Sequence, residues 1–101
     1  MPPIQSVLNA YTSDQITVGA SAVGLTQSKV RNGGRWAEKV LLTVGTATIR
    51  WLDDGTDPTS TVGHLAYAGD VINLDNRNRI EKFRAIRTGS TSAILDASYL
   101  A

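Results

Sequence analysis

The stretch TATIRWLDDGTDPTSTVG, residues 46–63, shows the plan that the rest of the chain repeats. Side chains within residues 47–52 alternate between two faces, with Ile49 and Trp51 on the same one. A period of two is typical of a β-strand whose faces meet different surroundings. The run ends at Asp-Asp-Gly, residues 53–55, where Asp and Gly permit a sharp turn. The stretch therefore predicts a strand that delivers the chain to a polar loop at one end of a β-sheet.

Similar runs recur on both sides of this stretch, at intervals of roughly 8–12 residues and separated by Gly, Asp and Asn turns. We predict strands at residues 15–18, 20–25, 36–44, 71–74, 79–88 and 92–99. Residues 79–87 also place Ile80, Phe83 and Ile86 three apart, as in a helix, but the flanking turn residues favour a strand. This pattern predicts an all-β fold, a single antiparallel β-sandwich or jelly-roll-like small barrel.

The loops and the start of the chain complete this organisation. Residues 1–14 are expected to form an extended N-terminal arm, because Pro2 and Pro3 favour polyproline II, and residues 11–14 read as a turn. Residues 15–101 are expected to form a single β domain. Residues 29–35, with Gly-Gly at their centre, are expected to be an exposed, mobile loop. Gly45 is either part of a two-residue turn or a bulge within one long bent strand.

Composition narrows the classes of function. The chain of 101 residues is 42% hydrophobic and carries a net charge of +1, which argues against attraction to nucleic acid or to an anionic membrane. It contains no cysteine, so thiolate catalysis and cysteine-based zinc sites are excluded. No apolar run reaches the ~20 residues of a membrane-spanning helix, and the first residues do not form a signal peptide. We expect no cofactor and no resident metal.

One acidic loop and one histidine are the candidates for chemistry. Asp53, Asp54 and Asp57 offer oxygen ligands for a cation, but turn formation and solubility explain them better, and the loop is not an EF-hand. His64, with Ser60 or Ser90, has the residue types of a hydrolase without any supporting spacing. We therefore expect no catalytic residues and no enzymatic activity.

Exposed aromatic and basic residues are the candidates for contact with a partner. Trp36 follows the Gly-Gly loop and is expected to be partly exposed, whereas Trp51 is expected to fill the core. Arg84 and Arg87 belong to a basic segment that fits a protein contact better than nucleic acid. The residues we expect to contact a partner are Pro2, Pro3, Ile4, Trp36, Arg84 and Arg87.

Four segments together carry a family resemblance. They are ITVGASAVGLT (16–26), AEKVLLTVGTATIRWLDDGTDPT (37–59), VGHLAYAGDVINL (62–74) and IEKFRAIRTGSTSAILDASY (80–99). They resemble small proteins encoded among the virion genes of tailed bacteriophages. That resemblance implies a β-sandwich virion component, such as a capsid decoration (cement) protein or a head or tail accessory protein, located on the phage head surface. It implies contact with the major capsid protein or other virion subunits and a homo-oligomer, with a trimer favoured.

Three rival functions follow from the same residues. A carbohydrate-binding or receptor-binding module of a tail or fibre would use Trp36, Tyr67 and the 53–57 loop, with Trp51 as a further stacking residue. A small hydrolase would use His64. A tail or neck component would have the same fold and a different neighbour.

Overall fold

The structure is a computed structural model that describes residues 8–101. Within that part of the chain nine strands and two short helices are present, and the paired strands are antiparallel. The predicted all-β fold is confirmed, whereas the finer form, sandwich or jelly-roll-like barrel, stays a prediction.

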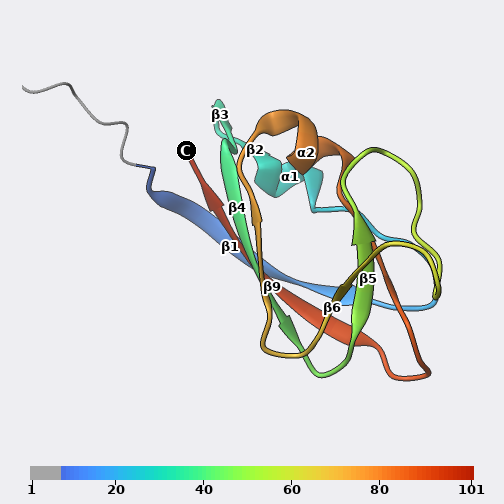
Figure 1. Ribbon diagram of the computed structural model, residues 1–101. Coiled ribbons are helices and arrows are strands. Elements are labelled where there is room, and N and C mark those ends of the chain that lie inside the picture. The colour runs from blue at the N-terminus through green and yellow to red at the C-terminus, as the bar shows by residue number, and fades with distance from the viewer. Residues whose placement is uncertain (1–7) are drawn as a thin grey trace, which may run out of the picture.

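A four-stranded sheet, which lies toward the left of the ribbon in Figure 1, contributes most of the buried side chains. Its order is β1-β9-β4-β7, and its strands are β1 (Ala10–Val18), β9 (Ala93–Leu100), β4 (Lys39–Gly45) and β7 (Val71–Leu74). In β4 and β9 alternate residues are fully buried, as the period of two predicts. This alternation confirms the strands predicted around residues 36–44, 71–74 and 92–99.

A three-stranded sheet lies opposite, in the order β6-β5-β8. Its strands are β6 (His64–Ala66), β5 (Ile49–Leu52) and β8 (Arg84–Arg87). Ile49, Ala66 and Ala85 of this sheet belong to the same buried cluster as Leu42 and Leu95 of the larger one. The described chain therefore folds around one hydrophobic core to which both sheets contribute.

The chain crosses from the larger to the smaller sheet at Gly45. Here the predicted alternatives, a hairpin turn or a bulge in one long strand, are both wrong, because β4 and β5 belong to different sheets. The Ala47 amide donates to the Gly45 carbonyl at 2.9 Å, and Thr46 between them has a φ of 75°. This tight three-residue turn redirects the strand at a cost in backbone strain.

Two predicted strands are replaced in part by other structure. Residues 77–82 form helix α2 (Arg77–Lys82), and only β8 remains of the strand predicted at 79–88. The Asn76 side chain accepts a hydrogen bond from the Arg79 amide at 2.9 Å and so caps the N-terminus of this helix. Residues 20–25 make a single bridge, between Val23 and Ala85, instead of a strand.

The start of the described chain contains a longer strand than predicted. The turn predicted at residues 11–14 is wrong, because β1 begins at Ala10 and pairs with β9 along its length. Residues 10–14 therefore belong to the sheet and not to an arm. The predicted arm residues Pro2, Pro3 and Ile4 lie outside the described residues.

Candidate functional site

A short hairpin holds Trp36 at the surface. Helix α1 (Gln27–Val30) leads directly into β2 (Arg31–Asn32), which pairs with β3 (Arg35–Trp36). Gly33 and Gly34 between them have φ values of 59° and 81°, the left-handed pair that a two-residue hairpin turn of the primed type needs. The loop predicted at residues 29–35 is thus a helical turn and a hairpin, and Trp36 is 39% exposed, as predicted.

Arginine side chains stack on this tryptophan. The guanidinium carbon of Arg31 lies 4.2 Å from the Trp36 ring centroid, and that of Arg77 lies 5.3 Å from it. Arg77 is the first residue of α2, so segments about forty residues apart in sequence meet at one ring. Arg31 also pairs with Glu81 of α2 at 3.1 Å. Cation–π contacts of this kind orient both the ring and the guanidinium groups.

Tyr11 and Arg35 extend the same surface toward β1. The Arg35 guanidinium carbon lies 5.9 Å from the Tyr11 ring centroid. The Tyr11 hydroxyl donates to the carbonyl oxygens of Lys29 and Val30, at 2.9 Å each, which fixes the base of the hairpin to β1. Burial raises the pKa of the Tyr11 phenol, and the Arg35 charge opposes that rise. We call Tyr11, Arg31, Arg35, Trp36 and Arg77 the Trp36 surface.

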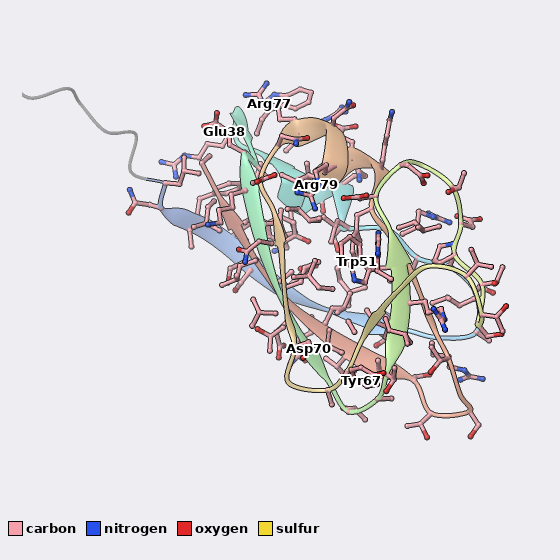
Figure 2. All side chains as sticks on the ribbon, viewed as in Figure 1. Glu38, Trp51, Tyr67, Asp70, Arg77 and Arg79 are labelled. Atoms are coloured by element: carbon pink, nitrogen blue, oxygen red, sulfur yellow. The ribbon has the colours of Figure 1, made fainter. Side chains whose placement is uncertain are left out.

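The Trp36 surface has the composition of a protein-binding hot spot. Tryptophan, tyrosine and arginine are the residues most enriched in such hot spots. The surface holds three arginines, of which Arg31 is paired with Glu81, and Glu38 lies beside Arg77 (Figure 2), so the basic residues outnumber the acidic ones. It complements an acidic partner surface, and the rigid hairpin reduces the ordering cost of binding.

The three aspartates of the 53–57 loop have separate partners. Asp53 accepts a hydrogen bond from Arg79 Nε at 2.6 Å, and Asp57 accepts one from Arg84 Nε at 2.8 Å. Hydrogen bonds from the Thr56 side chain and amide hold the pKa of Asp54 below its usual range. The Asp53 hydrogen bond raises the pKa of Arg79. In residues 8–101 no group of three His, Cys, Asp or Glu side chains is placed so that it could hold a metal ion.

Arg84 and Arg87 are engaged with their own chain. Besides Asp57, Arg84 donates through Nη2 to the Ala22 carbonyl at 3.2 Å. Arg87 donates through Nη1 to Ser92 Oγ at 3.2 Å. Both side chains are partly buried. These contacts link loops to β8, so their predicted role in a partner contact gains no support from their geometry.

The aromatic side chains do not form one sugar-stacking platform. Trp36 packs against Arg77, whereas Tyr67 lies at the opposite end of the molecule from Arg77 (Figure 2). Trp51 is half-buried against the core, and its ring centroid lies 4.8 Å from that of His64 and 5.8 Å from that of Phe83. The His64 ring packs on Trp51, and in the described chain no hydrogen bond joins His64 to Ser60 or Ser90.

Of the five residues of the Trp36 surface, the sequence predicted only Trp36, and Tyr11, Arg31, Arg35 and Arg77 were missed. A detectable signal was the Gly33-Gly34 pair between two polar residues, which is a hairpin signal that would have paired Arg31 with Trp36. The contribution of Arg77 had no local signal, because it depends on where α2 packs.

Among residues 8–101, no helix has the length and apolar composition needed to cross a membrane. Comparison of the chain with protein-family models, curated proteins and solved structures yields no match.

Proposed function

We propose that this protein is a non-enzymatic structural subunit of a tailed-phage virion, which decorates the assembled head and stabilises it. The phage assignment rests on the sequence resemblance of residues 16–99. The observation that carries a binding role is the Trp36 surface, where two guanidinium groups stack on one exposed indole. A protein that binds only the assembled shell stabilises it by linkage.

In this proposal the Trp36 surface contacts an acidic face of the major capsid protein. The indole supplies apolar contact area, and the three arginines supply charge complementarity and orientation. Many copies bound on a symmetric particle gain avidity, so each contact can be modest in area. A trimer at a three-fold position suits such a lattice.

The test is co-sedimentation with empty phage heads from the phage that carries the gene. We expect the protein to pellet with assembled heads and to stay in solution with unassembled shell subunits. Trp36→Ala should reduce the bound fraction at least tenfold, because truncating a hot-spot residue costs about 2 kcal/mol or more. Binding should also weaken as salt rises.

Tyr67→Ala is the matched control, since Tyr67 is an exposed aromatic far from the Trp36 surface. Equal losses for both variants, or no binding by the wild type, would contradict the proposal. Glycan binding that Trp36→Ala abolishes would instead support the carbohydrate-binding module. The stacked arginines weigh against that function, because they occupy space over the indole ring that a sugar would need.

A further inference from the structure

The outer edges of the two sheets are treated differently. On β8, the edge is covered by residues 19–23: Val23 and Ala85 exchange two amide hydrogen bonds of 2.9 Å, and the Arg87 amide donates to the Gly19 carbonyl at 3.0 Å. On β1, residues 26–30 lie alongside. There Thr26 donates to Asp14 at 2.6 Å, and the Tyr11 hydroxyl donates to the α1 carbonyls. The backbone hydrogen bonds of residues 19–23 thus occupy the edge of β8 and prevent pairing with another chain there, whereas the contacts at β1 are made by side chains.

The edge of β7 has no such cover in the described part of the chain. The Val44 amide donates to the Asp70 carbonyl at 2.9 Å, so the Asp70–Val71 peptide directs its N–H away from β4. Antiparallel alternation then directs the N–H and C=O groups of Val71 and Asn73 outward. These outward groups are the ones that an added strand would pair with.

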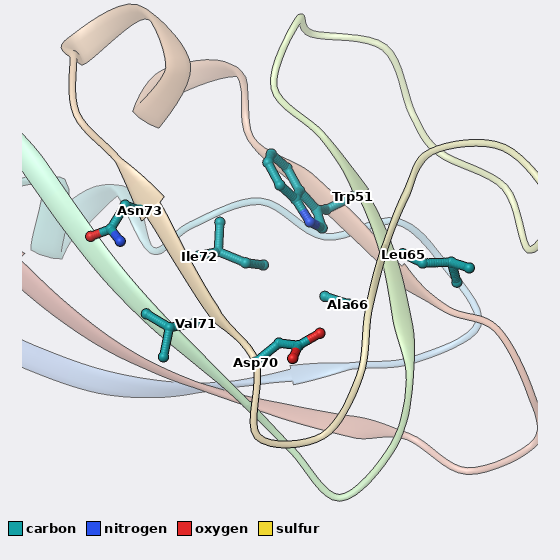
Figure 3. A pocket seen from close by; sticks show the side chains of 7 residues that line it. All are labelled: Trp51, Leu65, Ala66, Asp70, Val71, Ile72 and Asn73. Carbon is teal, nitrogen blue, oxygen red and sulfur yellow. The ribbon is translucent and has the colours of Figure 1, made fainter.

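Strands β6 and β7 diverge from the Tyr67–Asp70 turn and leave an open groove between them (Figure 3). The groove has a volume of about 270 Å³ and contains one charged side chain, Asp70. Trp51 and Ile72 point into it from opposite sides (Figure 3). We call this the β7 groove.

Two of the apolar residues that line the β7 groove are exposed to solvent. Val71 is 55% exposed and Leu65 is 44% exposed. The sequence of β7, Val-Ile-Asn-Leu, has neither the charged residue nor the proline that commonly protects an edge strand. An uncovered, uncharged edge beside exposed apolar groups matches an extended peptide segment better than a compact ligand.

We propose that the β7 groove binds residues 4–8 of a second copy of this chain, as an added strand on β7. The first thirteen residues contain no charged side chain, so they meet Asp70 and the apolar wall without charge repulsion. Ile4 and Val7 are β-branched and suit a strand, while Pro2 and Pro3 disfavour a helix before it.

The reach of the chain favours a neighbouring copy as the donor. Asn9 is hydrogen-bonded to Ala101 beside β1, and β1 and β7 are the opposite edges of the four-stranded sheet. Three strand spacings of about 4.8 Å separate them, roughly 14 Å in all. Counting back from Asn9, about four residues at 3.3 Å each are needed to cross that distance. Mainly the prolines would then be left to pair with β7 of the same copy. Proline has no amide N–H to donate, so the residues left to reach β7 of the same copy are poorly suited to form an added strand. Residues 4–8 are therefore expected to pair with β7 of another copy.

This contact is head-to-tail, because the donor and acceptor surfaces differ, and such contacts close into rings such as trimers. The inference goes beyond the head-binding proposal, because it concerns contact between copies and involves no residue of the Trp36 surface.

The test is the solution mass of the full chain by light scattering, over a dilution series from about 1 mM downward. We expect the wild type to be oligomeric at high concentration and Val71→Lys to remain a monomer. Val62→Lys is the matched control, since Val62 is 57% exposed in a loop outside the groove, and it should behave as the wild type. A wild type that is monomeric throughout, or equal masses for both variants, would overturn the proposal.

A complementation experiment tests the identity of the inserted segment. The full-length Ile4→Asp/Val7→Asp variant keeps an intact groove, and Val71→Lys keeps an intact donor segment. Each should be monomeric alone, and an equimolar mixture should form a dimer through the one remaining intact pair of surfaces. If the double variant keeps the wild-type mass, or the mixture stays monomeric, residues 4–8 are not the occupant.

Discussion

The covered edge at β8 and the uncovered edge at β7 are parts of one small fold, yet different flanking sequence gives them different properties. Along β8 the chain passes through residues 19–23, whose backbone completes the hydrogen bonding of the strand. Along β7 the chain continues directly into the Asn76-capped helix α2, and within residues 8–101 no segment returns to pair with the edge. The comparison teaches that a strand edge becomes a binding surface when the chain supplies nothing to cover it.

A pair of proline substitutions should separate the two kinds of edge, with the largest effect on the covered one. Val23→Pro removes the amide that donates to Ala85 and leaves a buried carbonyl without its partner. It should lower the free energy of unfolding by about 3 kcal/mol. Asn73→Pro removes an outward amide on an edge strand and should cost less than about 1 kcal/mol.

Urea denaturation at a concentration where single copies predominate measures both variants. Similar losses for the two would mean that the β7 edge is as fully paired as the β8 edge, which would contradict the comparison.

Alkaline pH should have the next largest effect, because it should lower the free energy of unfolding through a buried tyrosine between β9 and β1. The Tyr99 hydroxyl donates to Asp14 at 3.0 Å, between β9 and β1. Burial and then the Asp14 charge raise the pKa of Tyr99 well above its usual range. Below pH ~10 the Tyr99 phenol is protonated in both the folded and the unfolded chain, so its full contribution to the free energy of unfolding is present. Above it the unfolded chain loses the proton first, and stability falls as pH rises, by at most about 1.4 kcal/mol per pH unit.

Tyr99→Phe should reduce this alkaline slope in urea midpoints measured between pH 9 and 11.5. It should also cost about 1 kcal/mol at neutral pH through the lost hydrogen bond. The pKa of Tyr11 is raised by burial too, so it contributes a further loss of the same sign. The exposed Tyr67→Phe is the control. An unchanged slope in Tyr99→Phe would show that the phenol is not protected in the folded state.

Much of the fold could be predicted because its strands have local signatures. The alternation in residues 39–45, 49–52 and 93–100 reports which side chains face the core, and all three segments are strands. Helix α2 was missed because the flanking turn residues were given more weight than the helical spacing of Ile80 and Phe83, both of which are buried. There the Asn76 cap decides, and an asparagine before a short polar run looks the same in a turn.

The candidate surfaces were only partly predictable for a different reason. Exposure of Trp36 follows from its place beside Gly33-Gly34, but its stacking on Arg77 depends on tertiary packing between distant segments. The β7 groove depends on which strand lies at the edge of each sheet, and sheet order is a global property that local periodicity does not encode.

The most direct test of the uncovered edge is amide hydrogen exchange at Val71 and Asn73, followed by NMR as a function of protein concentration. We predict that both amides exchange fast in dilute solution, that Ile72 between them is protected, and that Val71 and Asn73 become protected as concentration rises. Strong protection of Val71 and Asn73 at every dilution would show a covered edge. Fast exchange at every concentration would show that no second copy pairs with β7, and either result would contradict the account.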